Sequence, residues 1–227
     1  MEQNSFIRDP YAPAPESTPV SIKDQNSLFI GGKWAETKSR DWMDTQNPAT
    51  GASLSRIAIA GREDVGLAVE AAKDAYTRSW SRIPALERGK YLFRLARLIQ
   101  EHSRELAVLE SMDGGKPIRE SRDADLPQVA AHFFYYAGWA DKLEYAFPGR
   151  QWEPVGVAAQ IIPWNFPLLM AAWKLAPALA CGNTVVLKPA EFTPLTALRL
   201  MELVEEAGFP AGVVNLVTGG GETGQYL

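Results

Sequence analysis

Apolar residues recur at helical spacing through much of the first 150 residues. Val65, Ala68, Val69 and Ala72 fall on one face of a helix predicted over residues 63–78. Three further amphipathic helices are predicted: one begins near Pro84, the following one ends at a break at 113–117, and the third covers residues 123–143. This half of the chain is therefore predicted to be mainly helical.

Short extended segments precede these helices. Residues 28–34 place apolar side chains on both sides of Gly31 and Gly32, which is typical of a small β-hairpin, and a strand is predicted over residues 53–60. Residues 1–27 hold several prolines and more acidic than basic side chains, and we interpret them as a mobile leader.

The pattern changes at Glu153. Residues 155–162 form a nearly unbroken apolar run between two prolines, as expected of a strand buried on both faces of a parallel sheet. The elements predicted after it are helix 166–181, strand 184–187, helix 194–207 and strand 213–217. Strand, helix, strand, helix, strand is the first βαβαβ half of a doubly wound fold.

The sequence therefore predicts an α/β protein with an incomplete doubly wound (Rossmann-like) parallel sheet. Residues 153–227 supply the truncated first half of an NAD-binding domain. Residues 28–152 supply the hairpin and the helical N-terminal part of the same cofactor domain.

Composition excludes several classes of function. The 227 residues carry a formal net charge of −4 and no dense basic cluster, so nucleic acid is not an expected partner. With Cys181, His102 and His132 as the only cysteine and histidines, we expect neither a disulfide nor a zinc site. No apolar run is long enough to span a membrane and no secretory signal is seen, so no membrane partner and a cytoplasmic location are expected.

Candidate chemistry lies just after the predicted strands, because ligands of open parallel sheets bind beyond the carboxyl ends of the strands. Three segments occupy such positions: 163–167, 188–191 and 218–224. All three are predicted to be site loops.

These loops belong to longer motifs. Residues 161–168 read IIPWNFPL, 173–180 read WKLAPALA, 182–191 read GNTVVLKPAE and 207–215 read AGFPAGVVN. The chain from about Leu28 onward resembles the amino-terminal portion of the NAD(P)-dependent aldehyde dehydrogenase superfamily. The resemblance implies oxidation of an aldehyde substrate to a carboxylate, with hydride transferred from a thiohemiacetal to NAD.

The resemblance assigns catalytic roles to Asn165 and Lys174. Asn165 matches the residue whose amide donates to the developing oxyanion, a contact worth about 3 kcal/mol of barrier. Taken alone, an Asn between two prolines would more often form an Asx-turn. Lys174 matches a lysine near the family's active site, although on a helix it could equally be a solvated or packing residue.

On the cofactor side, Lys188 and Glu191 match the pair that holds the adenosine ribose. A carboxylate accepts from ribose hydroxyls and repels a 2′-phosphate, which favours NAD, although relatives with this Glu also accept NADP. Outside the motif, the two would be an ordinary solvated ion pair worth about 0–1 kcal/mol. The cofactor-binding residues that the resemblance adds are Ile161, Ile162, Pro163 and Trp164, with Trp164 near the pyrophosphate.

Glycines at 219, 221 and 224 spell a dinucleotide fingerprint after a strand, but no acidic residue follows about twenty positions later. Ordinary turn chemistry explains them equally well. The resemblance assigns Gly221 to the adenine side, and we assign Gly224 no phosphate-binding role.

Cys181 is expected to be a buried structural thiol at a helix end. The family's nucleophilic Cys and general-base Glu match no residue of this chain, so the polypeptide is predicted to be inactive alone. The alternative is a non-catalytic nucleotide-binding or regulatory, partner-binding fragment. The edge of the third predicted strand is expected to be exposed and to favour association.

The segment 143–152 is shorter than in most members of the superfamily. In this respect the chain resembles the two-module, family-sixteen type of aldehyde dehydrogenase. Most members place part of an oligomerisation hairpin in this segment, so the standard dimer is not assumed for this chain.

Overall fold

The computed structural model describes residues 18–227, and most of the predicted leader, residues 1–17, lies outside them. Ordered structure begins earlier than the predicted boundary at residue 28. Strand β1 (Gln25–Asn26) pairs in parallel with β5 (Ser53–Ala58), and Arg56 N donates to Asp24 O at 2.9 Å. The leader was therefore predicted too long, because its end gains backbone partners from β5.

The predicted hairpin is present, and it joins the main sheet. Strands β2 (Leu28–Ile30) and β3 (Lys33–Ala35) pair antiparallel, with Phe29 opposite Trp34. Strand β2 also pairs antiparallel with β8 (Val214–Leu216), so the five-stranded order is β3-β2-β8-β7-β6. The sheet is mixed, not purely parallel.

The prediction that the third strand, β8, has an exposed edge is wrong, because β2 pairs with that edge. Strand β8 is flanked by β2 on one side and by β7 (Thr184–Lys188) on the other, so its backbone groups are paired. Within the described residues the sheet instead ends at β3 and at β6 (Val157–Ile161). Every residue of β7 is buried, whereas β6, predicted to be buried on both faces, is half-exposed because it is an edge strand.

A second, three-stranded sheet has the order β1-β5-β4, with β4 (Trp42–Gln46) antiparallel to β5. The turn between them is held by Asn47, whose side chain accepts from Ala49 N at 2.9 Å. Gly51, with a positive φ of 72°, completes that turn.

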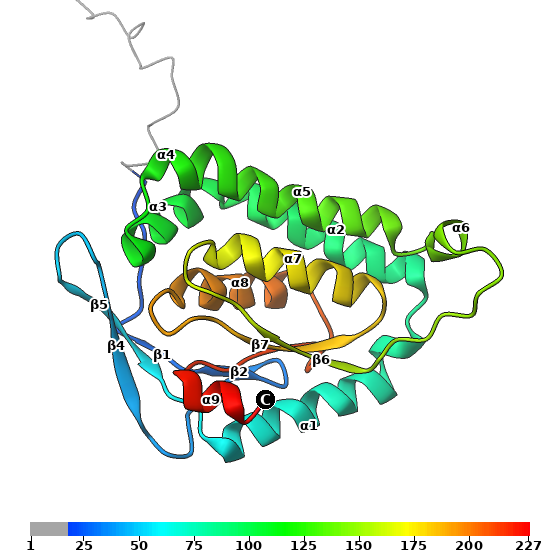
Figure 1. Cartoon of the computed structure of the whole chain (residues 1–227), viewed down its shortest axis with the longest axis horizontal. Helices are drawn as coiled ribbons and strands as arrows, with labels where there is room; N and C mark the ends of the chain where they lie inside the picture. Colours follow the sequence, from blue (N-terminus) through cyan, green and yellow to red (C-terminus); the bar gives the residue numbers. More distant parts are fainter. Residues whose placement is uncertain (1–17) are drawn as a thin grey trace, which may run out of the picture.

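Helices cover both faces of the five-stranded sheet (Figure 1). The long helices are α1 (Arg62–Arg78), α2 (Ala85–Glu101), α3 (Ser103–Gly114), α5 (Leu126–Trp139), α7 (Pro167–Ala180) and α8 (Leu195–Glu206). Helix α1 packs on one face of the sheet, α7 and α8 pack on the other, and α2 and α5 form an outer layer over α7. The short helices are η2 (Trp80–Arg82), α4 (Ile118–Glu120), α6 (Leu143–Ala146) and α9 (Gly221–Gln225).

The helix predicted over residues 123–143 starts and ends differently in the structure. A π-helical turn, η3 (Ser121–Asp125), leads into α5, which ends at Trp139. The other predicted helices lie within one or two residues of their observed bounds. Their apolar spacing was sufficient to place them because buried residues recur at helical spacing in each of them.

One hydrophobic core joins the two halves of the chain. It includes Ile57, Leu92 and Phe133 from the first half and Leu175 and Leu216 from the second, all fully buried. Such a core fixes the sheet, and with it the loops at the carboxyl ends of the strands. Within residues 18–227, no helix combines the length and apolar character that crossing a membrane requires.

Candidate functional site

The carboxyl ends of the parallel strands meet at one edge of the sheet. Ile161, the last residue of β6, lies opposite Lys188, the last residue of β7, and Ile162 N donates to Lys188 O at 3.1 Å. On the other side of β7, Val217 N donates to Leu187 O at 3.0 Å. The three predicted site loops therefore all begin at this edge.

The ammonium group of Lys188 is buried and has N–H donors that no hydrogen bond to a described residue uses. Its side chain is 4% exposed, and its Nζ donates to Pro189 O at 3.1 Å and lies 3.9 Å from a Glu191 carboxylate oxygen. Burial lowers the pKa of Lys188, an effect that the charge of Glu191 opposes. An ammonium has three donors, so this group can still bind a hydroxyl. It is not the solvated ion pair of the alternative interpretation.

Glu191 opens onto a cavity of about 560 Å³. Trp164, Phe192 and Thr193 share its wall, and Thr193 Oγ1 donates to Trp164 O at 3.5 Å. The loops that follow β6 and β7 thus contact each other. Trp164 and Phe192 are more than half exposed, so two aromatic surfaces flank the half-exposed carboxylate.

Asn165 is exposed, two residues before the start of α7. Its side chain makes no hydrogen bond to any described residue, whereas Asn47 makes a true Asx-turn bond to Ala49 N. The Asx-turn interpretation of Asn165 is therefore not what the structure shows. Its amide is free to donate to a ligand.

Lys174 does not lie in these loops. It is seven residues into α7, about 10 Å along the helix axis from Pro167, and its carbonyl accepts from Gln160 Nε2 at 2.9 Å. The structure thus separates Lys174 along the chain from the loop that holds Asn165. Its part in a complete active site stays a prediction.

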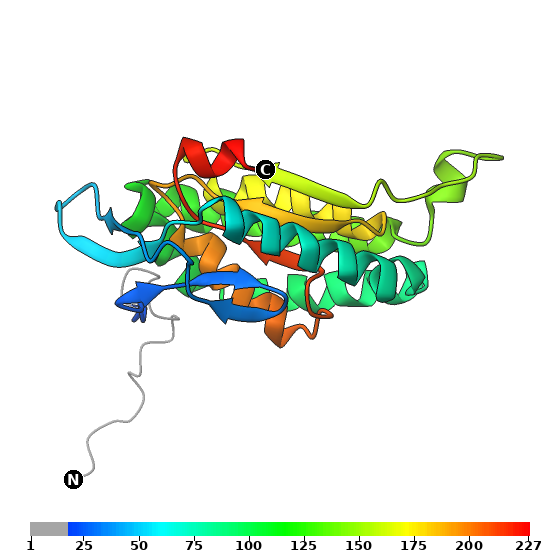
Figure 2. The same cartoon turned by 90° about the horizontal axis from the view of Figure 1, so that it is seen from below.

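The glycine-rich segment after β8 contacts the site through Gly224, not through Gly221, which the family resemblance assigned to the adenine side. Gly221 is exposed at the start of α9, and a Cβ there would meet nothing within 4 Å. A Cβ at Gly224 would lie 3.5 Å from Ile161 Cδ1 and 3.6 Å from Lys188 Cδ. Helix α9 therefore lies beside the ends of β6 and β7 (Figure 2). The fingerprint spacing alone could not show which glycine faces the sheet.

Gly219 is required by the backbone. Its φ is +144°, and a Cβ would lie 2.1 Å from Thr223 Oγ1, which donates to Ala60 O at 2.7 Å. No side chain fits in that space. This glycine shapes the turn between β8 and α9.

Cys181 caps the carboxyl end of α7, opposite the end that follows Asn165. The 14 residues of α7 separate the two by roughly 20 Å. Cys181 is partly exposed, not buried as predicted, because it borders a cavity that Tyr136 and Leu143 also line. Burial nevertheless raises the pKa of the Cys181 thiol, with the charge of Arg88 opposing. This is the opposite of an activated nucleophile.

Sequence reasoning missed an apolar strip on the exposed side of α7. Phe166, Met170 and Trp173 are spaced i, i+4 and i+7, and Phe166 and Trp173 are 40% and 44% exposed. The sequence displayed a signal for this strip, since residues 166–180 are apolar on nearly every side, and a helix of that kind is expected to bury more than one face. The strip starts next to Asn165.

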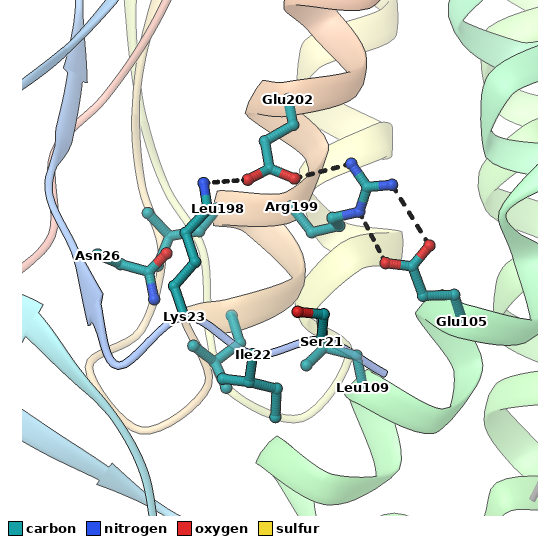
Figure 3. Close-up of a pocket in the computed structure, with 10 residues that line it drawn as sticks. Ser21, Ile22, Lys23, Asn26, Glu105, Leu109, Leu198, Arg199 and Glu202 are labelled. Atoms are coloured by element: carbon teal, nitrogen blue, oxygen red, sulfur yellow. Dashed lines mark hydrogen bonds and ion pairs between the residues drawn. The ribbon is translucent and has the colours of Figure 1, made fainter. Parts of the chain in front are cut away.

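A separate cavity of about 260 Å³ lies between residues 21–26, α3 and α8 (Figure 3). Its charges neutralise one another. Arg199 binds Glu105 at 2.9 Å and Glu202 at 2.8 Å, and Glu202 also pairs with Lys23. These contacts fasten the N-terminal segment to the helices. Among residues 18–227, no cluster of three or more His, Cys, Asp or Glu side chains is placed to hold a metal.

Comparison with known proteins shows which protein family the sequence matches. The sequence matches the aldehyde dehydrogenase family over residues 34–227. It is 48% identical to the mitochondrial aldehyde dehydrogenase of Rattus norvegicus over 221 residues, covering 93% of this chain and 42% of the relative. It is 49% identical to the phenylacetaldehyde dehydrogenase of Pseudomonas fluorescens over 213 residues, covering 87% and 42%.

A solved structure of the same family superposes closely on this chain. The NAD+ complex of an aldehyde dehydrogenase from Bacillus cereus superposes with a TM-score of 0.86 at 40% identity, over 92% of this chain and 46% of that chain. The chain thus spans less than half the length of each of these three proteins.

Proposed function

Because the chain belongs to the aldehyde dehydrogenase family, we propose that it supplies the cofactor half-site and the oxyanion donor for NAD-dependent oxidation of an aldehyde to a carboxylate. The observation that carries this proposal is the meeting of Lys188, Glu191 and the Trp164–Asn165 loop at one edge of the sheet. A similar structure was solved as its NAD+ complex, which supports NAD as the cofactor.

The residues present fit NAD. The Lys188 ammonium is desolvated and keeps unused donors, which suits ribose hydroxyls, and Glu191 beside it can accept from them. The carboxylate charge would repel a 2′-phosphate, so NAD is favoured over NADP. Ile161, Ile162 and Pro163 would contribute to the cofactor site through the strand end that they form, and Trp164 would contribute its exposed ring. When bound, NAD accepts the hydride.

Asn165 would act on the aldehyde. Its unpaired side-chain amide can donate to the oxygen that gains charge in the transition state, which is worth about 3 kcal/mol of barrier. The strip of Phe166, Met170 and Trp173 begins at this point and suits an apolar aldehyde chain.

The polypeptide is proposed to be inactive by itself. Covalent oxidation of this type needs a thiolate beside the oxyanion donor, and the sequence has a single cysteine. Cys181 lies at the far end of α7, with its pKa raised by burial. It cannot reach a substrate at Asn165 without unfolding α7.

The sheet is proposed to be the first half of a doubly wound fold. Strands β8, β7 and β6 follow the order 3-2-1 of such a half, and among residues 18–227 no strand pairs with the outer edge of β6, the position where the second half would add. The same edge is where we propose that the chain associates with other polypeptide.

An activity assay tests the proposed inactivity of the chain by itself. Purified chain is mixed with NAD and short and aromatic aldehydes, and NADH is followed at 340 nm, with Cys181→Ser as the matched control. We expect no NADH from either protein. NADH formation that Cys181→Ser abolishes would overturn the assignment of Cys181 and the proposed dependence on further residues.

A second candidate is a non-catalytic, partner-binding fragment. Large apolar side chains that are at least 40% exposed support it, among them Val155, Ile161 and Trp173 near the β6 edge and along α7. Calorimetric titration with NAD distinguishes the two candidates, because a partner-binding fragment without a cofactor site gives no heat of NAD binding.

A further inference from the structure

The last turns of α3 hold two buried carboxylates that the proposed chemistry does not use. Glu110 is 1% exposed and Asp113 is 3% exposed. Three residues apart, they lie on the same face of the helix. Asp113 is well satisfied, since it accepts from Leu195 N and from Thr45 Oγ1, each at 2.8 Å. Leu195 is the first residue of α8, so Asp113 fastens the helix that follows the Lys188–Glu191 loop.

Glu110 has no such partners. Neither of its carboxylate oxygens makes a hydrogen bond of ordinary length and angle, and the hydroxyl of Thr196 beside it is also unpaired. The backbone N–H of Leu168 and the Thr196 hydroxyl are the donors that act on it weakly. A buried charge left this way is costly, so its presence calls for a compensating role.

Leu168 connects Glu110 to the site. It is the second residue of α7 and lies three residues after Asn165. The first N–H groups of a helix lack partners within the helix and attract negative charge. The carboxylate of Glu110 therefore acts on the turn that anchors the Asn165 loop.

Lys116 approaches the same loop from another element. Its Nζ lies 4.1 Å from the centre of the Phe166 ring and pairs with the buried Asp125. The charges facing Glu110 are thus Lys116, which attracts its carboxylate, and Asp125 of η3, which repels it. Glu110, Asp125 and the partly buried Lys116 form one group of charges, and Lys116 joins it to the loop through the Phe166 ring.

We propose that Glu110 is a positioning residue for the Trp164–Phe166 loop, which it holds by acting on the first turn of α7 and on Lys116. The catalytic meaning of this placement rests on the proposed role of Asn165. Two carboxylates of one helix then serve the two loops of the site: Glu110 serves α7 and Asp113 serves α8.

Burial raises the pKa of Glu110 to about 7, against the opposing charge of Lys116. Above this pH the ionised carboxylate attracts the Leu168 N–H and the Lys116 ammonium. Below it the neutral acid loses that attraction. The geometry of the loop is therefore expected to change with pH near neutrality.

Amide spectra of the 15N-labelled chain test the proposal between pH 5.5 and 8.5. We expect the Leu168 backbone and Asn165 side-chain signals to shift with a common midpoint near pH 7. Glu110→Gln should keep the fold and abolish that titration. Glu120→Gln, at an exposed glutamate of α4, is the matched control and should leave it in place.

Absence of a titration at Leu168 in the unmodified chain overturns the proposal without any variant, as does a titration that persists in Glu110→Gln. If Glu110→Gln fails to fold, Thr196→Val is the second variant, and it should move the midpoint of the Leu168 shift. Adding NAD separates this proposal from the previous one. A loop that responds to Glu110, with no NAD-induced shifts at Lys188 and Trp164, would keep the positioning role and refute the cofactor site.

Discussion

Replacement of Asp113 by Asn should raise the free energy of unfolding relative to that of the wild type, and this difference should grow as the pH rises. Burial raises the pKa of Asp113 to about 6 from an ordinary value of 3.8, against hydrogen bonds from Leu195 N and Thr45 that lower it. The folded state therefore binds the proton more tightly than the unfolded state. The stability associated with Asp113 is full below pH 3.8 and is lost as pH rises towards 6.

The magnitude follows from these two values. Ionisation of Asp113 costs the folded state about 1 kcal/mol at pH 4.5 and about 3 kcal/mol at pH 7.5. Asn has the same shape, keeps an acceptor for Leu195 N and cannot ionise. The free energy of unfolding of Asp113→Asn, minus that of the wild type, should therefore rise by about 2 kcal/mol between these pH values.

Urea unfolding followed by circular dichroism at pH 4.5 and 7.5 measures this difference. Asp41→Asn, at an exposed aspartate, is the matched control and should show little change between the two pH values. A difference for Asp113→Asn that stays constant from pH 4.5 to 7.5, or that falls, would refute the burial argument.

Other substitutions test the remaining parts of the account. Leu175→Ala, in the fully buried core, should cost about 2–5 kcal/mol of unfolding free energy in urea titrations, and a cost below 1 kcal/mol would contradict the packing described. Gly219→Ala should lower the thermal midpoint, since a Cβ has no room beside Thr223; an unchanged midpoint would show that the turn adapts. Glu191→Gln should move the ratio of NADP to NAD affinity towards NADP, and a fixed ratio would place Glu191 off the ribose. In a longer polypeptide that contains the nucleophile, Asn165→Ala should lower turnover by about 10²-fold with NAD affinity retained; unaltered turnover would exclude the oxyanion role.

Periodicity was enough to place most of the helices and the three parallel strands. Helix α1 and strand β7 each bury a pattern that local sequence displays directly. The pairing of β2 with β8 was not predictable in this way, because it joins residues nearly 190 positions apart through backbone groups that carry no sequence signal. That pairing is also why the expected free edge of β8 was wrong.

The site shows the same division. The family motifs located Asn165, Lys188 and Glu191, and the sheet rule brought their loops together. Neither could reveal that Gly224, not Gly221, faces Lys188, or that Glu110 lies beneath the first turn of α7. Those facts depend on how α9 and α3 pack, which is set by tertiary contacts far away in the chain.

Calorimetric titration of the chain with NAD tests the central claim most directly, with Lys188→Met compared after its fold is verified by circular dichroism. The account predicts that the wild type binds one NAD and that Lys188→Met binds it about 10- to 100-fold more weakly, because a charge-assisted hydrogen bond worth about 1.5–3 kcal/mol is lost. No heat of binding at millimolar NAD, or equal affinity in the two proteins, would contradict the assignment of this sheet edge as the cofactor site.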